Sequence, residues 1–403
     1  MTRLYLKKGR EESLRRFHPW VFSGAVEGID GPDPAEGDAV AVYSARQEFL
    51  GWGHYQIGSI AVRMLSFADD MPEGGPDPAF WASRLQRCLD ARGAFGLADQ
   101  AATNCYRLVH GEGDGLPGLI IDWYDGVCVL QAHSAGMFRA SAAIATALQT
   151  VYGTRLRAVY DKSAGTAPYK AGLNLGDGYL WQADGTTSYC PRTVLENGHQ
   201  FRVDWETGQK TGFFLDQREN RALVERYALG RRVLNLFCYT GGFSVYALAG
   251  GAVSVDSVDS SARAVDLVKE NIRLNFGPDA PHRALCCDAI DFVKDAPKGA
   301  YDLMIVDPPA FAKHRGALNN ALRAYQRLNA AAIGAVAPGG LLFTFSCSQV
   351  VDRETFALAI FSAAAETGRS VRIIDRLNQP ADHAVNIYHP EGAYLKGLVL
   401  YVE

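Results

Sequence analysis

Three apolar, strand-like runs end in residues whose types could support chemistry on a ligand. Cys347 closes the run Leu341-Leu-Phe-Thr-Phe-Ser-Cys347 and offers a thiol. Asp307 ends a second run, where two following prolines prevent the strand from continuing. A glycine pair, Gly241-Gly242, breaks a third run. A nucleophile, a carboxylate and a glycine turn at strand ends are the parts of a reaction site.

Cys347 could act as a covalent nucleophile. A thiolate that adds to C6 of a pyrimidine makes C5 electron-rich enough to attack the methyl group of a sulfonium. Asp307 could hold the base through N3 and its exocyclic amine, while Phe311 could stack on its flat face. A single buried cysteine is most often inert packing, so the hypothesis depends on these neighbours. Together they favour methyl transfer from S-adenosylmethionine to a pyrimidine ring carbon in RNA.

A cofactor site is predicted from the glycine turn and from acidic residues that end later strands. Gly241 and Gly242 lack side chains, so a ligand can approach the backbone closely. The phosphate-binding pattern GxxxxGK(S/T) and the dinucleotide pattern GxGxxG are both missing from this turn. Asp259 is expected to bind the ribose hydroxyls, with Asp256 as its rival, and Asp288 to bind the adenine amino group. Any of these carboxylates could instead cap the helix that follows it.

Strands and helices alternate from about residue 230 to the end of the chain. Expected strands cover 232–236, 252–258, 284–286, 301–306, 341–345, 370–374 and 398–401. Expected helices cover 243–249, 261–275, 288–294, 318–336 and 352–367. This alternation predicts an α/β fold with a largely parallel sheet and helices on both faces. Ligands bind such sheets beyond the carboxyl ends of the strands, where each motif above falls.

Two further segments precede this part of the chain. Residues 1–75 hold strand-like runs at 39–43, 49–52 and 60–65, which predict a small β-barrel. The Pro- and Gly-rich linker 71–78 leads into a mixed α+β segment with helices at 79–93 and 137–150 and strands at 118–122, 127–131 and 158–160. Residues 161–190 are polar and Gly-rich and receive no assignment. The predicted domains are therefore 1–75, 76–200 and 201–403.

Bulk composition excludes several classes of protein. A net charge of -4 and a pI of about 6.2 mean that any RNA contact depends on local patches of Lys and Arg. The eight cysteines form no CxxC pair, so we expect reduced thiols and no metal site. No apolar run is long enough to cross a membrane, and the N-terminus lacks a signal-peptide core. We therefore expect a cytoplasmic protein with no membrane contact, whose oligomeric state is left open, a homodimer included.

Several longer segments carry a family resemblance that covers nearly the whole chain. They are 7–24, 107–119, Lys210-Thr-Gly-Phe-Phe-Leu-Asp-Gln-Arg218, 234–243, 307–311, 343–348 and the tail 381–397. These segments resemble, in order, the N-terminal PUA domain, the central domain, the methyltransferase core and the C-terminal end of the large-subunit ribosomal RNA cytosine-C5 methyltransferase family. Many RNA cytosine methyltransferases carry a second cysteine beside the Asp-Pro pair. This chain has Pro308-Pro309 there, which leaves adduct release without an obvious assistant.

The resemblance implies a class I (Rossmann-like) methyltransferase domain behind an N-terminal PUA-like β-barrel and a central α+β domain. It implies S-adenosyl-L-methionine as the cofactor and Cys347 as the nucleophile, with Asp307 at the base. The residues expected at the cofactor are Asp216, Gln217, Asn235, Phe237, Tyr239, Thr240, Gly241, Gly242, Phe243, Asp259, Asp288 and Asp307.

The resemblance also implies ribosomal RNA, 23S or a large-subunit precursor, as the partner. Residues expected to contact it are Pro308, Pro309 and Phe311 at the base, and Lys8, Arg10, Arg15 and Arg16 of a basic cluster. This cluster also contains Lys7 and His18 and is interleaved with Phe17 and Trp20. A solvated basic face is the alternative for the cluster, and His383 and Lys396 receive no role. Two other interpretations of function stay open. One is methylation of another RNA base or substrate, and the other is a noncatalytic RNA-binding ribosome-assembly factor.

Overall fold

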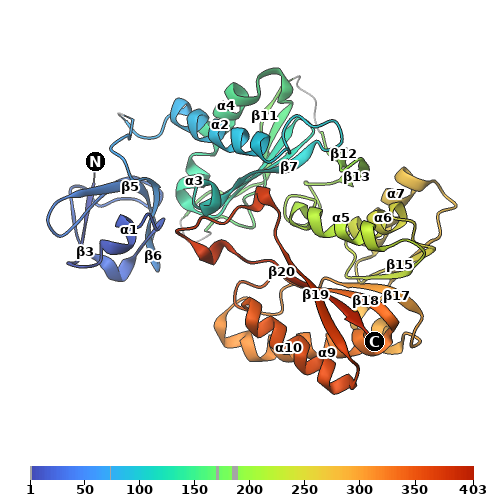
Figure 1. The fold of residues 1–403 in the computed structure, drawn as a ribbon. Helices are drawn as coiled ribbons and strands as arrows, with labels where there is room; N and C mark the ends of the chain where they lie inside the picture. The colour runs from blue at the N-terminus through green and yellow to red at the C-terminus, as the bar shows by residue number, and fades with distance from the viewer. Residues whose placement is uncertain (1, 73, 169–171, 184–188) are drawn as a thin grey trace. The chain divides into compact units, whose positions relative to one another are not determined.

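The computed structural model describes residues 2–72, 74–168, 172–183 and 189–403. The chain folds into two units (Figure 1). The first comprises Met1–Val194, Val203–Leu215 and Ala381–Gly392, and the second comprises Leu195–Arg202, Asp216–Pro380 and Ala393–Glu403. No helix among the described residues is both long and apolar enough to span a membrane.

The first unit begins with a curled six-stranded sheet in the order β2-β6-β5-β4-β1-β3 (Figure 1). Its elements are β1 (Arg3–Leu6), α1 (Glu12–Arg15), β2 (Trp20–Phe22), β3 (Val26–Asp30), β4 (Ala39–Tyr43), β5 (Phe49–Tyr55) and β6 (Ile60–Ser66). Alternating apolar residues of these strands, such as Val40, Val42 and Val62, form a small core with Leu14 of α1. The three strands predicted for this segment are confirmed as β4, β5 and β6.

The same unit continues with a five-stranded sheet in the order β11-β10-β9-β8-β7. Its elements are α2 (Pro78–Ala94), β7 (Cys105–His110), β8 (Leu119–Tyr124), β9 (Val127–Ala132), α3 (Ala135–Arg139), α4 (Ser141–Tyr152), β10 (Ala158–Asp161) and β11 (Gly178–Gln182). The single helix predicted over 137–150 is wrong, because the chain forms two helices that meet at Ala140. Strand β11 lies within the segment that received no assignment.

The second unit holds a seven-stranded sheet in the order β16-β15-β14-β17-β18-β20-β19. Its strands are β14 (Arg232–Leu236), β15 (Ser254–Asp259), β16 (His282–Cys286), β17 (Tyr301–Val306), β18 (Val336–Ser346), β19 (Val371–Asn378) and β20 (Lys396–Val402). Neighbouring strands from β16 to β18 run parallel, and β20 is antiparallel to both β18 and β19. The sheet thus agrees with the predicted strand–helix alternation.

Helices cover both faces of this sheet (Figure 1). They are α5 (Arg218–Tyr227), α6 (Gly242–Ala249), α7 (Ala262–Phe276), α8 (Ala289–Asp295), α9 (Leu318–Ala335) and α10 (Arg353–Thr367). Leu234, Met304 and Leu342 face one core with α8, α9 and α10, while their strand neighbours are also buried. Strands that are buried on both faces have continuous apolar sequences, so the ends of these strands could be predicted from the sequence. A hairpin of β12 (Arg192–Glu196) and β13 (His199–Val203) precedes α5.

Candidate active site

The turn between β14 and α6 has an unusual backbone. Phe237, Tyr239 and Gly241 all have positive φ values, of 57°, 46° and 79°. For residues with a side chain this conformation is disfavoured and tends to be retained where a ligand must be bound. The amide of Tyr239 donates to Asp259 Oδ2 at 3.0 Å, so the turn is fastened to the end of β15. The turn is therefore pre-shaped rather than flexible.

Both glycines of the turn are required by packing as well as by any ligand. A Cβ at Gly241 would lie 2.9 Å from Val268 Cγ1 of α7, and one at Gly242 would lie 2.9 Å from Arg221 Cδ of α5. Thr240 is buried, and its carbonyl accepts a 2.8 Å hydrogen bond from the Asn271 side chain. The sequence analysis attributed the two glycines to close approach of a ligand alone. Close packing of helices α5 and α7 against the turn is an additional reason for them.

The rival carboxylates of β15 have different surroundings. Asp256 is buried and accepts hydrogen bonds from Arg283, at 2.8 and 2.5 Å, and from Tyr301 at 2.6 Å. Burial alone would raise its pKa, but these hydrogen bonds lower it. Asp259 is half-buried at the strand end, and among the described residues it accepts hydrogen bonds only from the backbone amides of Tyr239 and Ser261. Each of its oxygens keeps a lone pair for a ligand hydroxyl, so Asp259 is the better candidate.

Other predicted cofactor residues have structural partners. Asp288 is exposed and caps α8, its Oδ1 accepting from the amides of Ile290 at 2.7 Å and Asp291 at 3.0 Å. Asn235 is 1% exposed and donates to Ser244 Oγ at 2.9 Å. Phe243 is 6% exposed. Asp288 therefore caps a helix, as the alternative interpretation expected, and keeps its second oxygen at the surface. Asn235 and Phe243 lie beneath the turn and support it.

Asp307 lies at the carboxyl end of β17 in a hydrogen-bonded chain. Gln217 Nε2 donates to Asp307 Oδ2 at 3.0 Å, and Asn220 Nδ2 donates to Gln217 Oε1 at 2.6 Å. Gln217 is buried and cannot rotate freely, so it fixes the carboxylate. Asp216 instead accepts a 2.6 Å hydrogen bond from Tyr394 Oη. The structure thus places Gln217, predicted at the cofactor, against the reaction-site carboxylate.

The segment after Asp307 packs against α9. Pro308 is buried and Pro309 exposed. The half-buried Phe311 ring contacts Tyr325, with 4.7 Å between ring centroids. One side of Phe311 is therefore covered, so base stacking requires its other side. Burial raises the pKa of Tyr325 to about 12, and its hydroxyl accepts a 2.9 Å hydrogen bond from Ser346 Oγ.

Cys347 follows β18 directly, and its neighbours are firmly held. In the parallel register Val306 of β17 pairs with Thr344 of β18, so Asp307 and Cys347 leave adjacent strands at the same edge. Cys347 is half-buried, while Ser348 is buried and donates to the carbonyl of Ala312 at 2.7 Å. The thiol is thus presented at the strand edge that also carries the glycine turn and Asp259.

Residues 106–400 match the family described as S-adenosylmethionine-dependent methyltransferases, and residues 4–67 match the PUA-like domain. The chain belongs to the S-adenosylmethionine-dependent methyltransferase family. It is 39% identical over 400 residues to the ribosomal RNA large subunit methyltransferase I of Aeromonas hydrophila, with 98% of each chain covered. The identity to the protein of that name from Escherichia coli is also 39%, over 410 residues, with the same coverage. A solved methyltransferase complexed with SAH has a TM-score of 0.84 and 25% identity over 100% of both chains.

These similarities confirm the predicted methyltransferase fold, the PUA-like N-terminal domain and S-adenosylmethionine as the cofactor. They also confirm the resemblance to large-subunit ribosomal RNA methyltransferases. The roles of individual site residues stay predictions, supported by the geometry described above.

In this methyltransferase, the predicted basic cluster is exposed on the PUA-like domain. Lys8, Arg10 and Arg16 are exposed, whereas Arg15 forms an ion pair with Glu48. Arg10 and the exposed Phe22 line a cavity of about 340 Å³. A cation beside an aromatic ring in a concave surface suits a polynucleotide, so the geometry supports a docking role for the cluster.

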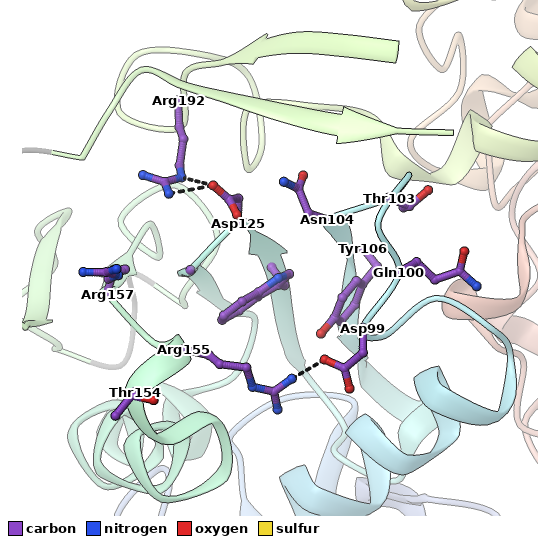
Figure 2. A pocket seen from close by; sticks show the side chains of 12 residues that line it. Asp99, Gln100, Thr103, Asn104, Tyr106, Asp125, Thr154, Arg155, Arg157 and Arg192 are labelled. Carbon is purple, nitrogen blue, oxygen red and sulfur yellow. Dashed lines mark hydrogen bonds and ion pairs between the residues drawn. The ribbon is translucent and has the colours of Figure 1, made fainter. Parts of the chain in front are cut away.

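A second cavity, of about 320 Å³, lies in the central part of the first unit and was not predicted. Figure 2 shows three arginines around it, but Arg192 faces Asp125 and Arg155 faces Asp99 in ion pairs. Two of the three positive charges are therefore neutralised. The N-terminal cluster therefore stays the predicted RNA contact.

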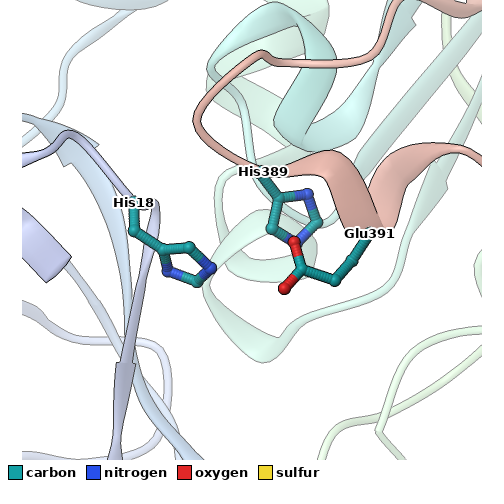
Figure 3. A group of neighbouring side chains, drawn as sticks. All are labelled: His18, His389 and Glu391. Atoms are coloured by element: carbon teal, nitrogen blue, oxygen red, sulfur yellow. The ribbon is translucent and has the colours of Figure 1, made fainter.

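His18, predicted as part of the basic cluster, instead packs beside His389 and Glu391 (Figure 3). The potential ligand atoms of these three residues lie within 4.8 Å of one another. The Trp20 amide donates to His18 Nδ1 at 3.2 Å, and the Trp20 ring lies 4.3 Å from that of His389. Burial lowers the pKa of His389, against the weaker opposing effects of the Glu112 and Glu391 charges. A neutral imidazole packed on Trp20 accounts for the arrangement.

Proposed function

We propose that this methyltransferase forms 5-methylcytidine in large-subunit ribosomal RNA through a covalent adduct with Cys347. The observation that carries the proposal is the position of Cys347 and Asp307 at the ends of adjacent strands, beside the glycine turn. Methylation of an amino nitrogen would need no thiol at this position. Methylation of the ring carbon C5 does need a thiol, because C5 of an unactivated pyrimidine is a poor nucleophile.

The residues around the turn fit S-adenosylmethionine. Helix α6 begins at Gly242 without a side-chain cap, so the amides of its first turn suit the carboxylate of the ligand. Asp259 would accept from the ribose hydroxyls and Asp288 from the adenine amino group. A Cβ on either glycine would disturb the turn that supports them. When bound, the cofactor supplies a methyl group on a positively charged sulfur.

Two protein groups, Asp307 and Cys347, act on the cytosine. Asp307, oriented by Gln217, accepts a hydrogen bond from the exocyclic amine and, as the carboxylic acid, donates one to N3, which fixes the ring above the thiol. The Cys347 thiolate would form a bond to C6, and the π electrons of the C5–C6 bond would move to C5. C5 would then take the methyl group as the bond from that methyl carbon to the cofactor sulfur breaks, which leaves S-adenosylhomocysteine. Transfer of the C5 proton to a base then expels the Cys347 sulfur as a thiolate and restores the aromatic ring.

Ribosomal RNA is the proposed substrate because the relatives that match along the whole chain are ribosomal RNA large subunit methyltransferases. The exposed cations of the PUA-like domain supply the local positive charge that a chain of net charge -4 otherwise lacks. A cytoplasmic location and the domain limits 1–75, 76–200 and 201–403 belong to the same proposal.

The test is transfer of a labelled methyl group to unmodified total ribosomal RNA, followed by nucleoside analysis. We expect labelled 5-methylcytidine with the native chain and none with Cys347→Ala, while both bind S-adenosylmethionine equally. Label in another nucleoside would reassign the base. Cofactor binding with no label in any RNA would favour a noncatalytic assembly factor.

A further inference from the structure

Lys396 is a buried cation whose hydrogen-bond acceptors are carbonyl groups. It is 5% exposed, and its ammonium donates to the backbone oxygens of Ser348 and Val351. Among the described residues, no carboxylate forms an ion pair with Lys396. Burying an ammonium without an anion nearby is strongly unfavourable. A negatively charged neighbour would therefore stabilise the charged form of Lys396.

Strand pairing places this cation beside the proposed nucleophile. In the antiparallel register of β18 and β20, Lys396 lies opposite Ser346, the residue before Cys347. The two carbonyls that it binds belong to the loop that begins with Cys347. Lys396 thus binds the loop that carries the thiol. It also places a positive charge near Cys347.

The charged groups that face Lys396 leave the thiol as its counter-ion. They are Cys347, Asp352 and Arg353. Arg353 repels it, and Asp352 is an exposed cap of α10 that accepts from the Thr355 amide at 2.7 Å. Burial lowers the pKa of Lys396 to about 8, and a charged Cys347 opposes that fall more strongly than Asp352 does.

We propose that Lys396 is a positioning residue that stabilises the thiolate form of Cys347 and thereby readies the nucleophile at neutral pH. A cation next to a thiol lowers the thiol pKa, which raises the fraction of reactive thiolate. The inference rests on the proposed function for its catalytic meaning. The coupling between the two charges follows from the geometry alone.

The test measures alkylation of Cys347 by iodoacetamide against pH in the full chain, with mass spectrometry of the peptide that carries it. We expect a midpoint for the native chain below the ordinary thiol value of about 8.5. Lys396→Met should raise the midpoint by about 1–3 units, and Lys396→Arg should keep most of the native value. The exposed Lys298 serves as a control, because Lys298→Met should leave the midpoint unchanged.

A midpoint that is the same in Lys396→Met as in the native chain would overturn the inference. A native midpoint at or above about 8.5 would overturn it too, and this measurement needs no variant that might misfold. In methyl transfer, Lys396→Met should regain kcat as pH rises, which a variant with only structural damage would not do. Binding of S-adenosylhomocysteine checks that each variant is folded.

Alkylation requires neither RNA nor methyl transfer, so the two proposals can fail separately. A midpoint that depends on Lys396 without any 5-methylcytidine would count against the proposed function and leave the charge coupling standing. Formation of 5-methylcytidine, together with an alkylation midpoint that is the same with and without Lys396, would overturn only the charge coupling.

Discussion

At the scale of single residues, hydrogen-bond partners separate two carboxylates that the sequence left as rivals. Asp256 already accepts hydrogen bonds from Arg283 and Tyr301, while Asp259, within the part of the chain that the structure describes, accepts only from backbone amides at the strand end. Asp259→Ala should therefore weaken S-adenosylmethionine binding by about 1–3 kcal/mol, because ligand hydroxyls lose their acceptor. Isothermal titration calorimetry with the cofactor measures the change directly.

Asp256→Asn is the matched comparison for this prediction. It should lower the stability of the chain, since it weakens a hydrogen-bonded ion pair, but leave the cofactor affinity of the folded protein unchanged. The opposite pattern, with weak binding in Asp256→Asn and normal binding in Asp259→Ala, would move the ribose contact to Asp256.

Local patterns indicated the positions of some candidate site residues and not others. The positions of Cys347 and Asp307 at strand ends were predictable because each ends a continuous apolar run. The proposed role of Lys396 was not, because it depends on the pairing of β20 with β18, which links residues far apart in the sequence. The contact of Gln217 with Asp307 is equally non-local. A lysine within the mostly buried strand 396–402 was the one available signal.

At the scale of elements, the β14–α6 turn depends on Gly241 for both conformation and packing. Its φ is 79°, and an added Cβ would lie 2.9 Å from Val268 Cγ1. Gly241→Ala should lower the free energy of unfolding by about 2–4 kcal/mol, from backbone strain and a clash in the core. Urea unfolding measures the loss, and cofactor affinity should fall with it.

Gly230 provides the control for this prediction, because its φ is 70° but no atom lies within 4 Å of an added Cβ. Gly230→Ala should cost only the strain, about 1–2 kcal/mol. In the Gly241→Ala, Val268→Ala double variant, part of the extra loss should be recovered. Equal losses at the two glycines would show that contact with Val268 is unimportant.

Elements were predictable where one periodicity dominates a segment. The strands and helices of the second unit lie close to their expected ranges because parallel strands are buried on both faces. Strand β18 starts at Val336, whereas the sequence analysis expected this strand only from residue 341. The break at Ala140 was missed because Ser134 caps a short first helix, and apolar residues continue across the break.

At the scale of the whole molecule, the N-terminal part is continuous in packing with the central part. Trp52 and Leu65 share a hydrophobic core with Trp81, beyond the Pro- and Gly-rich linker. The change of composition at the linker therefore does not show whether the segments on its two sides have separate hydrophobic cores. The three domain limits stay a prediction for this reason.

RNA binding by the chain should depend on local cations of the PUA-like domain. Lys8→Ala, Arg10→Ala and Arg16→Ala together should weaken binding of ribosomal RNA and reduce the slope of log K against log salt by about 2. Filter binding over a range of salt concentrations measures both effects. The control combines Lys269→Ala, Lys294→Ala and Arg372→Ala, whose cations are already paired with carboxylates. An equal change of slope in the control would argue against a dedicated docking surface.

Buried histidines should make the molecule sensitive to acid. Burial lowers the pKa of His54 to about 4, against the weaker opposing effect of Asp38, and burial likewise lowers the pKa of His282 to about 4. Between that pH and about 6.5, the unfolded chain binds more protons than the folded chain. The stability contribution of each histidine is therefore complete above pH 6.5 and is lost as the pH falls toward 4.

His54 is the better test, because it is 5% exposed and lies against Gly136 of α3. The native chain should lose about 2 kcal/mol more unfolding free energy than His54→Leu between pH 7 and 5, because only the native chain must keep a buried imidazole neutral. Urea unfolding followed by tryptophan fluorescence at each pH measures the difference, independent of what the substitution costs at pH 7. The exposed His314 gives the control, since His314→Leu should follow the native curve. A His54→Leu curve parallel to the native one would mean that His54 becomes protonated without unfolding the chain, which requires water or an acidic partner to reach its ring.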